Sequence, residues 1–166
     1  GQWNYDSDNR KPPDNAVLVP APTLFEPDEI TSEVCALVEA EFSHHYGDLY
    51  PFYFAVTHAQ AQQVLAQFIA ERLADFGTYQ DAMRTGEPFM FHSHIGFYLN
   101  CGLLSPMQAV DAAVDAYDNG LAPLNSVEGS RDWSAFDSRP DRNVDLACAA
   151  DSVSLKCPCS ARLRHK

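Results

Sequence analysis

Residues 79–106 read YQDAMRTGEPFMFHSHIGFYLNCGLLSP, and no other stretch of the chain says more about its architecture. A tyrosine and a short polar run are followed by a His-Ser pair inside an apolar segment, Phe89 to Asn100. Because that segment is apolar on all sides, it predicts a buried helix. Ser105-Pro106-Met107-Gln108 then has the pattern of a capping box with proline at the first helical position, which predicts the start of another helix.

Upstream of this stretch, apolar residues recur with the period of a helix. Asp28 to Phe42 predicts a helix, with Thr31 or Ser32 as its N-cap. Its apolar residues share one face: Ile30, Val34, Leu37, Val38 and Phe42. Thr57 is the expected N-cap of a second helix, which Gly77 should end in the left-handed conformation. The apolar stripe of that second helix consists of Val64, Leu65, Phe68, Ile69, Leu73 and Phe76.

The remaining segments complete an all-α prediction. The helix after Ser105 should run to Tyr117, and Gly120 should close it. No segment alternates with a period of two for long enough to indicate a strand. Residues 1–27, rich in Pro, Asp and Asn, are interpreted as an extended connector, and residues 28–129 as the helical domain. Residues 130–166 have no sustained apolar period and should form an irregular tail with little order.

The charge of the chain limits its partners. The net charge is −12, and 46% of the 166 residues are hydrophobic. Residues 1–129 carry four Lys or Arg against 18 Asp or Glu, which gives −14. Duplex DNA is held largely by Lys and Arg on its phosphates, so this part should bind DNA poorly by itself. No apolar run approaches the roughly 20 residues of a membrane span, and no secretion signal opens the chain, which favours a cytoplasmic protein.

The cysteines and histidines give no strong metal signal. The five cysteines are Cys35, Cys101, Cys148, Cys157 and Cys159, an odd number that favours reduced thiols. Cys157-Pro158-Cys159 has a spacing that structural metal sites rarely use. His92 and His94 would diverge by about 200° on a helix and share one face only on an extended segment. We therefore expect no metal site, and no catalytic nucleophile signature is visible either.

From WNYDSDNRK (residues 3–11) to APLNSVEG (residues 122–129), the chain resembles the photolyase and cryptochrome superfamily. It is most similar to the bacterial iron–sulfur branch, the photolyase-related proteins that repair (6-4) lesions in DNA. The resemblance implies the N-terminal part of a helical domain that binds flavin adenine dinucleotide (FAD). Tyr79 then occupies the position of a tyrosine that packs against the flavin.

The expected cofactor-binding residues are Tyr79, His92, Ser93, His94, Ile95 and Gly96. Ser93 offers a hydroxyl, and the N–H groups of a first helical turn that begins there would point at the cofactor's pyrophosphate. Gly96 and Phe97 depart from the family pattern, which has a second hydroxyl and a proline at these places. The alternative is an ordinary helix N-terminus beside an ordinary half-buried tyrosine.

The resemblance implies a flavin-dependent, light-driven DNA photolyase that acts on pyrimidine dimers or (6-4) photoproducts, or a cryptochrome-like photoreceptor. Its partner in the parent family would be UV-damaged DNA. Family segments that follow Gly129 carry the electron relay, the lesion-handling histidines and the cluster cysteines, and they have no counterpart here. We therefore expect a fragment that is inactive alone, without catalytic residues or an iron–sulfur cluster. The alternative is an acidic helical interaction module that associates through exposed apolar helix faces.

Overall fold

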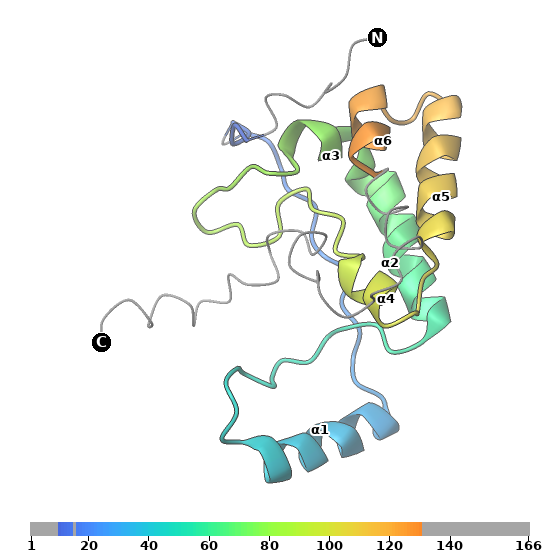
Figure 1. The fold of residues 1–166 in the computed structure, drawn as a ribbon. Coiled ribbons are helices and arrows are strands. Elements are labelled where there is room, and N and C mark those ends of the chain that lie inside the picture. Colours follow the sequence, from blue (N-terminus) through green and yellow to red (C-terminus); the bar gives the residue numbers. More distant parts are fainter. Residues whose placement is uncertain (1–9, 15, 131–166) are drawn as a thin grey trace.

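The computed structural model describes residues 10–14 and 16–130, and these residues form a small helical assembly (Figure 1). Its helices are α1 (Glu29–Phe42), α2 (His58–Glu71), α3 (Leu73–Tyr79), α4 (Gly96–Asn100), α5 (Pro106–Asp118) and α6 (Leu124–Ser130). The described residues contain no strand, only one isolated bridge between Arg84 and Glu87, so the all-α prediction is confirmed for them. The expected tail, residues 130–166 with Cys148, Cys157 and Cys159, lies outside the described residues except for Ser130, which is the last residue of α6.

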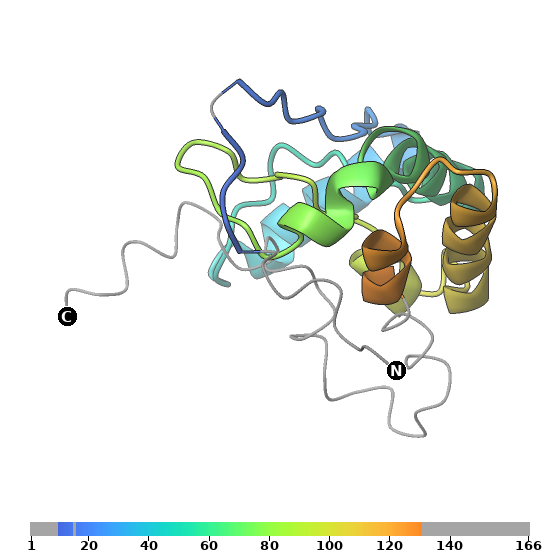
Figure 2. The same cartoon turned by 90° about the horizontal axis from the view of Figure 1, so that it is seen from above.

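No described helix is both long enough and apolar enough to cross a membrane. The hydrophobic core consists of residues of α2, α3, α4 and α5 and of the segments next to them, and α6 packs against α3 and α5. In Figure 2, α5 and α6 lie side by side, with α3 next to α6. Phe68 and Phe76 meet edge to face in this core, with ring centroids 5.3 Å apart. Small residues at Ala109, Ala113 and Ala116 let α5 approach closely.

Two of the predicted helix starts are confirmed. Thr57 caps α2, and its N–H and the side chain of Gln60 complete a capping box. Ser105 and Gln108 form the same arrangement at the start of α5. At α1 the prediction of Thr31 or Ser32 as the cap is wrong. Asp28 is the cap, because its carboxylate accepts the backbone N–H of Thr31 at 2.7 Å.

The predicted role of Gly77 is wrong, because the helix does not end there. The α2 helix stops at Glu71, and Gly77 lies inside α3 without a left-handed conformation. A Cβ atom on Gly77 would lie 2.5 Å from the backbone of Asn125 and Ser126 in α6. The N–H of Gly77 donates to the Ser126 hydroxyl at 3.0 Å. Glycine is therefore present because α3 and α6 approach each other closely.

The prediction of one buried helix from Phe89 to Asn100 is correct only at its end. Met90 and His94 have positive φ angles of 45° and 57°, which a right-handed helix does not allow. The helix α4 consequently starts at Gly96, and residues 89–95 are irregular. Met90, Phe91 and Ile95 are buried nonetheless. The apolar character of residues 89–95 follows from this burial. Because their apolar side chains show no clear period, the pattern could not distinguish a helix from the observed turns.

The close approach at Gly77 yields a stability prediction. Gly77→Ala places a methyl group against the α6 backbone, and we expect it to lower the free energy of unfolding by about 2 kcal/mol or more. Thermal and urea denaturation of the purified chain measure this loss. The control is Thr78→Ala, an exposed neighbour on the same helix, which should change stability by less than about 0.5 kcal/mol. Equal stability of the two variants would contradict the packing account.

Candidate functional site

The predicted cofactor residues lie on the path from the end of α3 to the start of α4. Tyr79 is the last residue of α3 and is half-buried. Its ring lies 5.3 Å from the ring of Phe91, with the two planes tilted by 30°. Because Phe91 directly precedes His92, the fold brings Tyr79 next to the His-Ser segment, although 11 residues lie between Tyr79 and Phe91.

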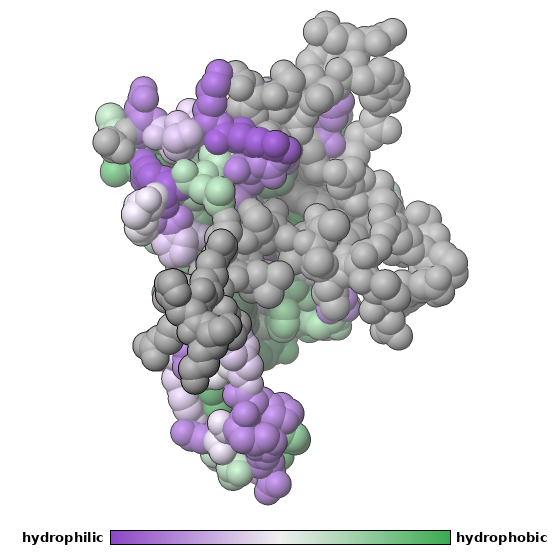
Figure 3. Space-filling view, turned by 60° about the vertical axis from the view of Figure 1, so that its left-hand side comes forward, coloured by the Kyte–Doolittle hydropathy of each residue, from purple (hydrophilic) through white to green (hydrophobic). Residues whose placement is uncertain are grey.

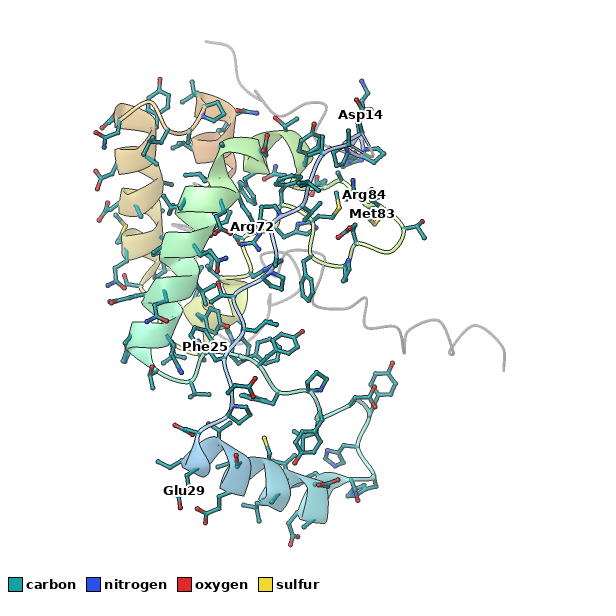
Figure 4. All side chains as sticks on the ribbon, turned by 180° about the vertical axis from the view of Figure 1, so that it is seen from behind. Asp14, Phe25, Glu29, Arg72, Met83 and Arg84 are labelled. Carbon is teal, nitrogen blue, oxygen red and sulfur yellow. The ribbon has the colours of Figure 1, made fainter. Side chains whose placement is uncertain are left out.

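The loop between Tyr79 and Phe91 is closed by local interactions. Arg84 and Glu87 form a bridge, in which the Glu87 N–H donates to the Arg84 carbonyl at 3.1 Å. Their side chains form an ion pair at 3.3 Å. The Arg84 guanidinium also donates to the carbonyls of Asp14 and Val17 at 3.4 and 3.3 Å. The loop is therefore attached to the N-terminal connector (Figure 4).

Arg72 makes the second attachment of the connector, at the junction of α2 and α3. Its side chain is 2% exposed, and Nη2 donates to the carbonyls of Pro20, at 3.0 Å, and Ala21. Figure 4 shows Arg72 beside the connector as it passes toward Phe25. Burial lowers the pKa of Arg72, but a guanidinium stays charged in a protein. The positive charge is thus fixed inside the molecule.

Sequence reasoning missed both arginines. The available signal was their rarity, because Arg72 and Arg84 are half of the four basic residues in positions 1–129. A cation at the end of a strongly apolar helix stripe is costly to bury without partners. Such a residue needs carbonyl or carboxylate acceptors, and the Pro-rich connector supplies carbonyl groups that no helix or strand uses.

The side chains of the His-Ser segment point inward. His92 is 3% exposed, Ser93 is 1% exposed, and Ile95 is part of the hydrophobic core. The His92 N–H donates to the carbonyl of Phe89 at 3.3 Å and closes a turn. The hydroxyl of Ser93 therefore does not lie on the surface that a cofactor would reach first. We expected it to face the pyrophosphate.

His94 holds the turn in place. Its φ angle is 57°, its Nε2 lies 3.1 Å from the Phe89 carbonyl, and its ring meets the Phe89 ring edge to face. Burial lowers the pKa of His94 to about 4. The Phe89 carbonyl acts in the opposite direction, while the charges of Arg72 and His92 lower the pKa further. The ring is therefore neutral at pH 7, with the proton on Nε2 where the carbonyl accepts it.

The start of α4 offers backbone donors, at positions that differ from the expected ones. The helix begins at Gly96, so its first turn contains the N–H groups of Gly96, Phe97 and Tyr98. We expected the N–H groups of His94, Ile95 and Gly96 as donors, and of these only Gly96 belongs to this turn. Residues 10–14 and 16–130 contain no group of three His, Cys, Asp or Glu side chains that could hold a metal ion.

Only some of the six expected cofactor-binding residues are placed where they could contact the phosphates of a flavin cofactor. Tyr79 and Gly96 are half-buried and can be reached from outside. His92, Ser93 and Ile95 form the interior of the same turn. An anion beside this turn would therefore meet backbone N–H groups and the ring of Tyr79, and would not meet the Ser93 hydroxyl without a rearrangement of the turn.

Comparison with known proteins finds similarity to photolyase-related proteins. The family model "Deoxyribodipyrimidine photo-lyase-related protein" matches residues 1–54. A (6-4) photolyase of Agrobacterium fabrum is 46% identical over 129 residues, which is 78% of this chain and 25% of that protein. An uncharacterized protein of Acanthamoeba polyphaga mimivirus is 38% identical over 52 residues, 31% of this chain and 40% of the viral protein. The chain thus spans a quarter of the length of the photolyase that it matches.

The depressed pKa of His94 predicts a pH dependence of stability. Below its ordinary pKa of 6.5 the unfolded chain protonates this ring, whereas the folded chain does so only near pH 4. Stability should therefore fall as the pH drops from 6.5 to 4, by up to about 3 kcal/mol. Urea unfolding at pH 7 and pH 4.5 measures the change.

The matched variant is His94→Asn, because asparagine tolerates a positive φ angle but does not titrate. Between the two pH values the original chain should lose about 2 kcal/mol more than the variant. If both proteins lose the same amount, His94 is not neutral in the folded chain and the description of the turn is incorrect.

Proposed function

We propose that this chain belongs to the deoxyribodipyrimidine photolyase-related family, whose model matches residues 1–54, and that it forms part of the FAD-binding domain of a light-driven photolyase-related protein. The observation that carries this proposal is the 46% identity over 129 residues to a (6-4) photolyase. The helical architecture and the junction of Tyr79 with the His-Ser turn support it. The chain spans a quarter of that relative, so the activity of a whole photolyase is a proposal for the parent protein only.

Each candidate residue has a separate part in this proposal. Tyr79, supported by Phe91, presents its ring to the flavin. Gly96 starts α4 and, lacking a side chain, lets an anion approach the first-turn N–H groups. His92, Ser93, His94 and Ile95 keep the turn in shape from the inside. When bound, a flavin supplies light absorption and electron transfer, and the protein supplies orientation.

Lesion binding belongs to other parts of the parent protein in this proposal. Residues 1–129 carry a net charge of −14, and a surface of this sign repels the DNA phosphates. Arg72 and Arg84 are engaged with the connector carbonyls. We therefore assign the chain no catalytic residue and only poor binding to DNA by itself. We also propose a cytoplasmic location.

A second candidate function is that of an acidic interaction module. The observation that favours it is the exposed apolar side of α1, where Ile30, Val34 and Leu37 are each more than half exposed. An interaction module would use this side and would need no cofactor. The two candidates are compatible if the partner is another part of the same photolyase-related protein.

The flavin proposal is tested by titrating the purified chain with FAD and following flavin fluorescence. We expect saturable quenching with a Kd above about 1 µM, because the fit is partial. Tyr79→Leu should weaken binding by about tenfold, the value of one aromatic stacking contact.

Tyr117→Leu is the matched control, since Tyr117 is an exposed tyrosine on α5. It should bind FAD like the original chain, and circular dichroism checks that all proteins are folded. The flavin proposal would be refuted if the folded chain did not quench flavin fluorescence. It would also be refuted if Tyr79→Leu and Tyr117→Leu weakened the quenching equally.

A further inference from the structure

The α1 helix exposes an apolar stripe to solvent. Ile30, Val34 and Leu37 follow one another at spacings of four and three residues, so they line one side of the helix. Their exposed fractions are 72%, 51% and 58%. Apolar side chains that recur on one side of a helix at these spacings normally face a core. We call this set the α1 stripe.

The stripe is not the side by which α1 attaches to the rest of the chain. The buried residues of α1 are Thr31 and Cys35, which lie on a different side of the helix. The helices that pack together are α2, α3, α5 and α6, and α1 lies away from them (Figure 1). Within the described part of the chain, the α1 stripe is therefore left without a covering element.

Carboxylates border the α1 stripe. Helical spacing places Glu33 beside Ile30 and Leu37, three and four residues away. Glu41 follows Leu37 by one turn, and both glutamates are exposed. No Lys or Arg occurs from residue 12 to residue 71, whereas this interval holds nine Asp or Glu, Glu71 included. Figure 3 shows hydrophobic and hydrophilic residues next to each other at the end of the molecule that α1 forms. The charged side chains around the α1 stripe are thus all negative.

The negative charge around the α1 stripe determines which kind of binding partner it favours. A second copy of the chain would bring one acidic border against another, and like charges across an interface cost several kcal/mol. An apolar helix bordered by Lys or Arg would cover the same side chains and pair with Glu33 and Glu41. Opposite charges also speed the encounter and fix its register. The electrostatics therefore favour a basic partner over self-association.

We propose that the α1 stripe docks an amphipathic helix whose apolar face is bordered by lysine and arginine. In a photolyase-related parent, that helix lies in the length outside the match, which is 75% of the Agrobacterium relative (100 − 25). This origin rests on the proposed function. The preference of the α1 stripe for a basic amphipathic helix does not rest on the proposed function, because it follows from the exposure and charge of α1 alone.

The experiment uses the whole chain and a fluorescently labelled synthetic helix with a leucine stripe bordered by lysines. Anisotropy at low salt should show saturable binding, which weakens as salt screens the charges. The same helix with glutamates in place of the lysines should bind at least tenfold more weakly. Val34→Ser with Leu37→Ser should also reduce binding of the lysine helix at least tenfold.

The matched control is Met107→Ser with Val114→Ser, which removes two exposed apolar side chains of α5 and should leave binding unchanged. Equal binding of the two peptides, equal loss in both double variants, or no binding of the lysine helix would overturn the proposal. Sedimentation at low salt should show a monomer, and a dimer that the α1 variant abolishes would identify a second copy as the occupant. FAD titration of the α1 variant should match the original chain, which separates this proposal from the flavin proposal.

Discussion

A buried arginine is the constraint on which the candidate site depends. Arg72 lies where α2 ends and α3 begins, and its guanidinium binds the connector carbonyls of Pro20 and Ala21. Burial lowers the pKa of His94 in the turn before α4, and the charge of Arg72 lowers it further. A cation that is 2% exposed must keep its acceptors, because breaking such contacts leaves an uncompensated charge in the interior. The connector, α3 and the His94 turn are therefore positioned together.

Local chemistry made some parts of the fold predictable from the sequence. Thr57 and Ser105 each form a capping box with a residue three positions later, so the pattern is visible in four consecutive letters. Gly77 shows the limit of this reasoning. Its role depends on Ser126, 49 residues away, and a glycine near an expected helix end gives the same signal for a cap and for a close helix contact.

The sequence predicted which residues belong to the candidate site, and this membership stays a prediction, whereas the geometry of these residues could not be predicted. The resemblance placed Tyr79 and the His-Ser segment in one site, and the contact of Tyr79 with Phe91 brings the two together. The inward orientation of Ser93 was not predictable, because it follows from the positive φ angles of Met90 and His94. Neither residue is a glycine, so no residue type at these positions indicated a left-handed turn. Arg72 was missed because its acceptors are backbone carbonyls far away in the sequence.

The most direct test of this account is residue-resolved hydrogen exchange in the chain and in Arg72→Met, which keeps the length of the side chain but removes its donors. In the original chain, the amides of Phe25 and His92 should be protected by the carbonyls of Tyr53 and Phe89. In the variant, both should exchange at least tenfold faster, while the α5 amides keep their protection. Unchanged protection of Phe25 and His92 in a folded variant would contradict the claim that Arg72 positions the connector and the turn together.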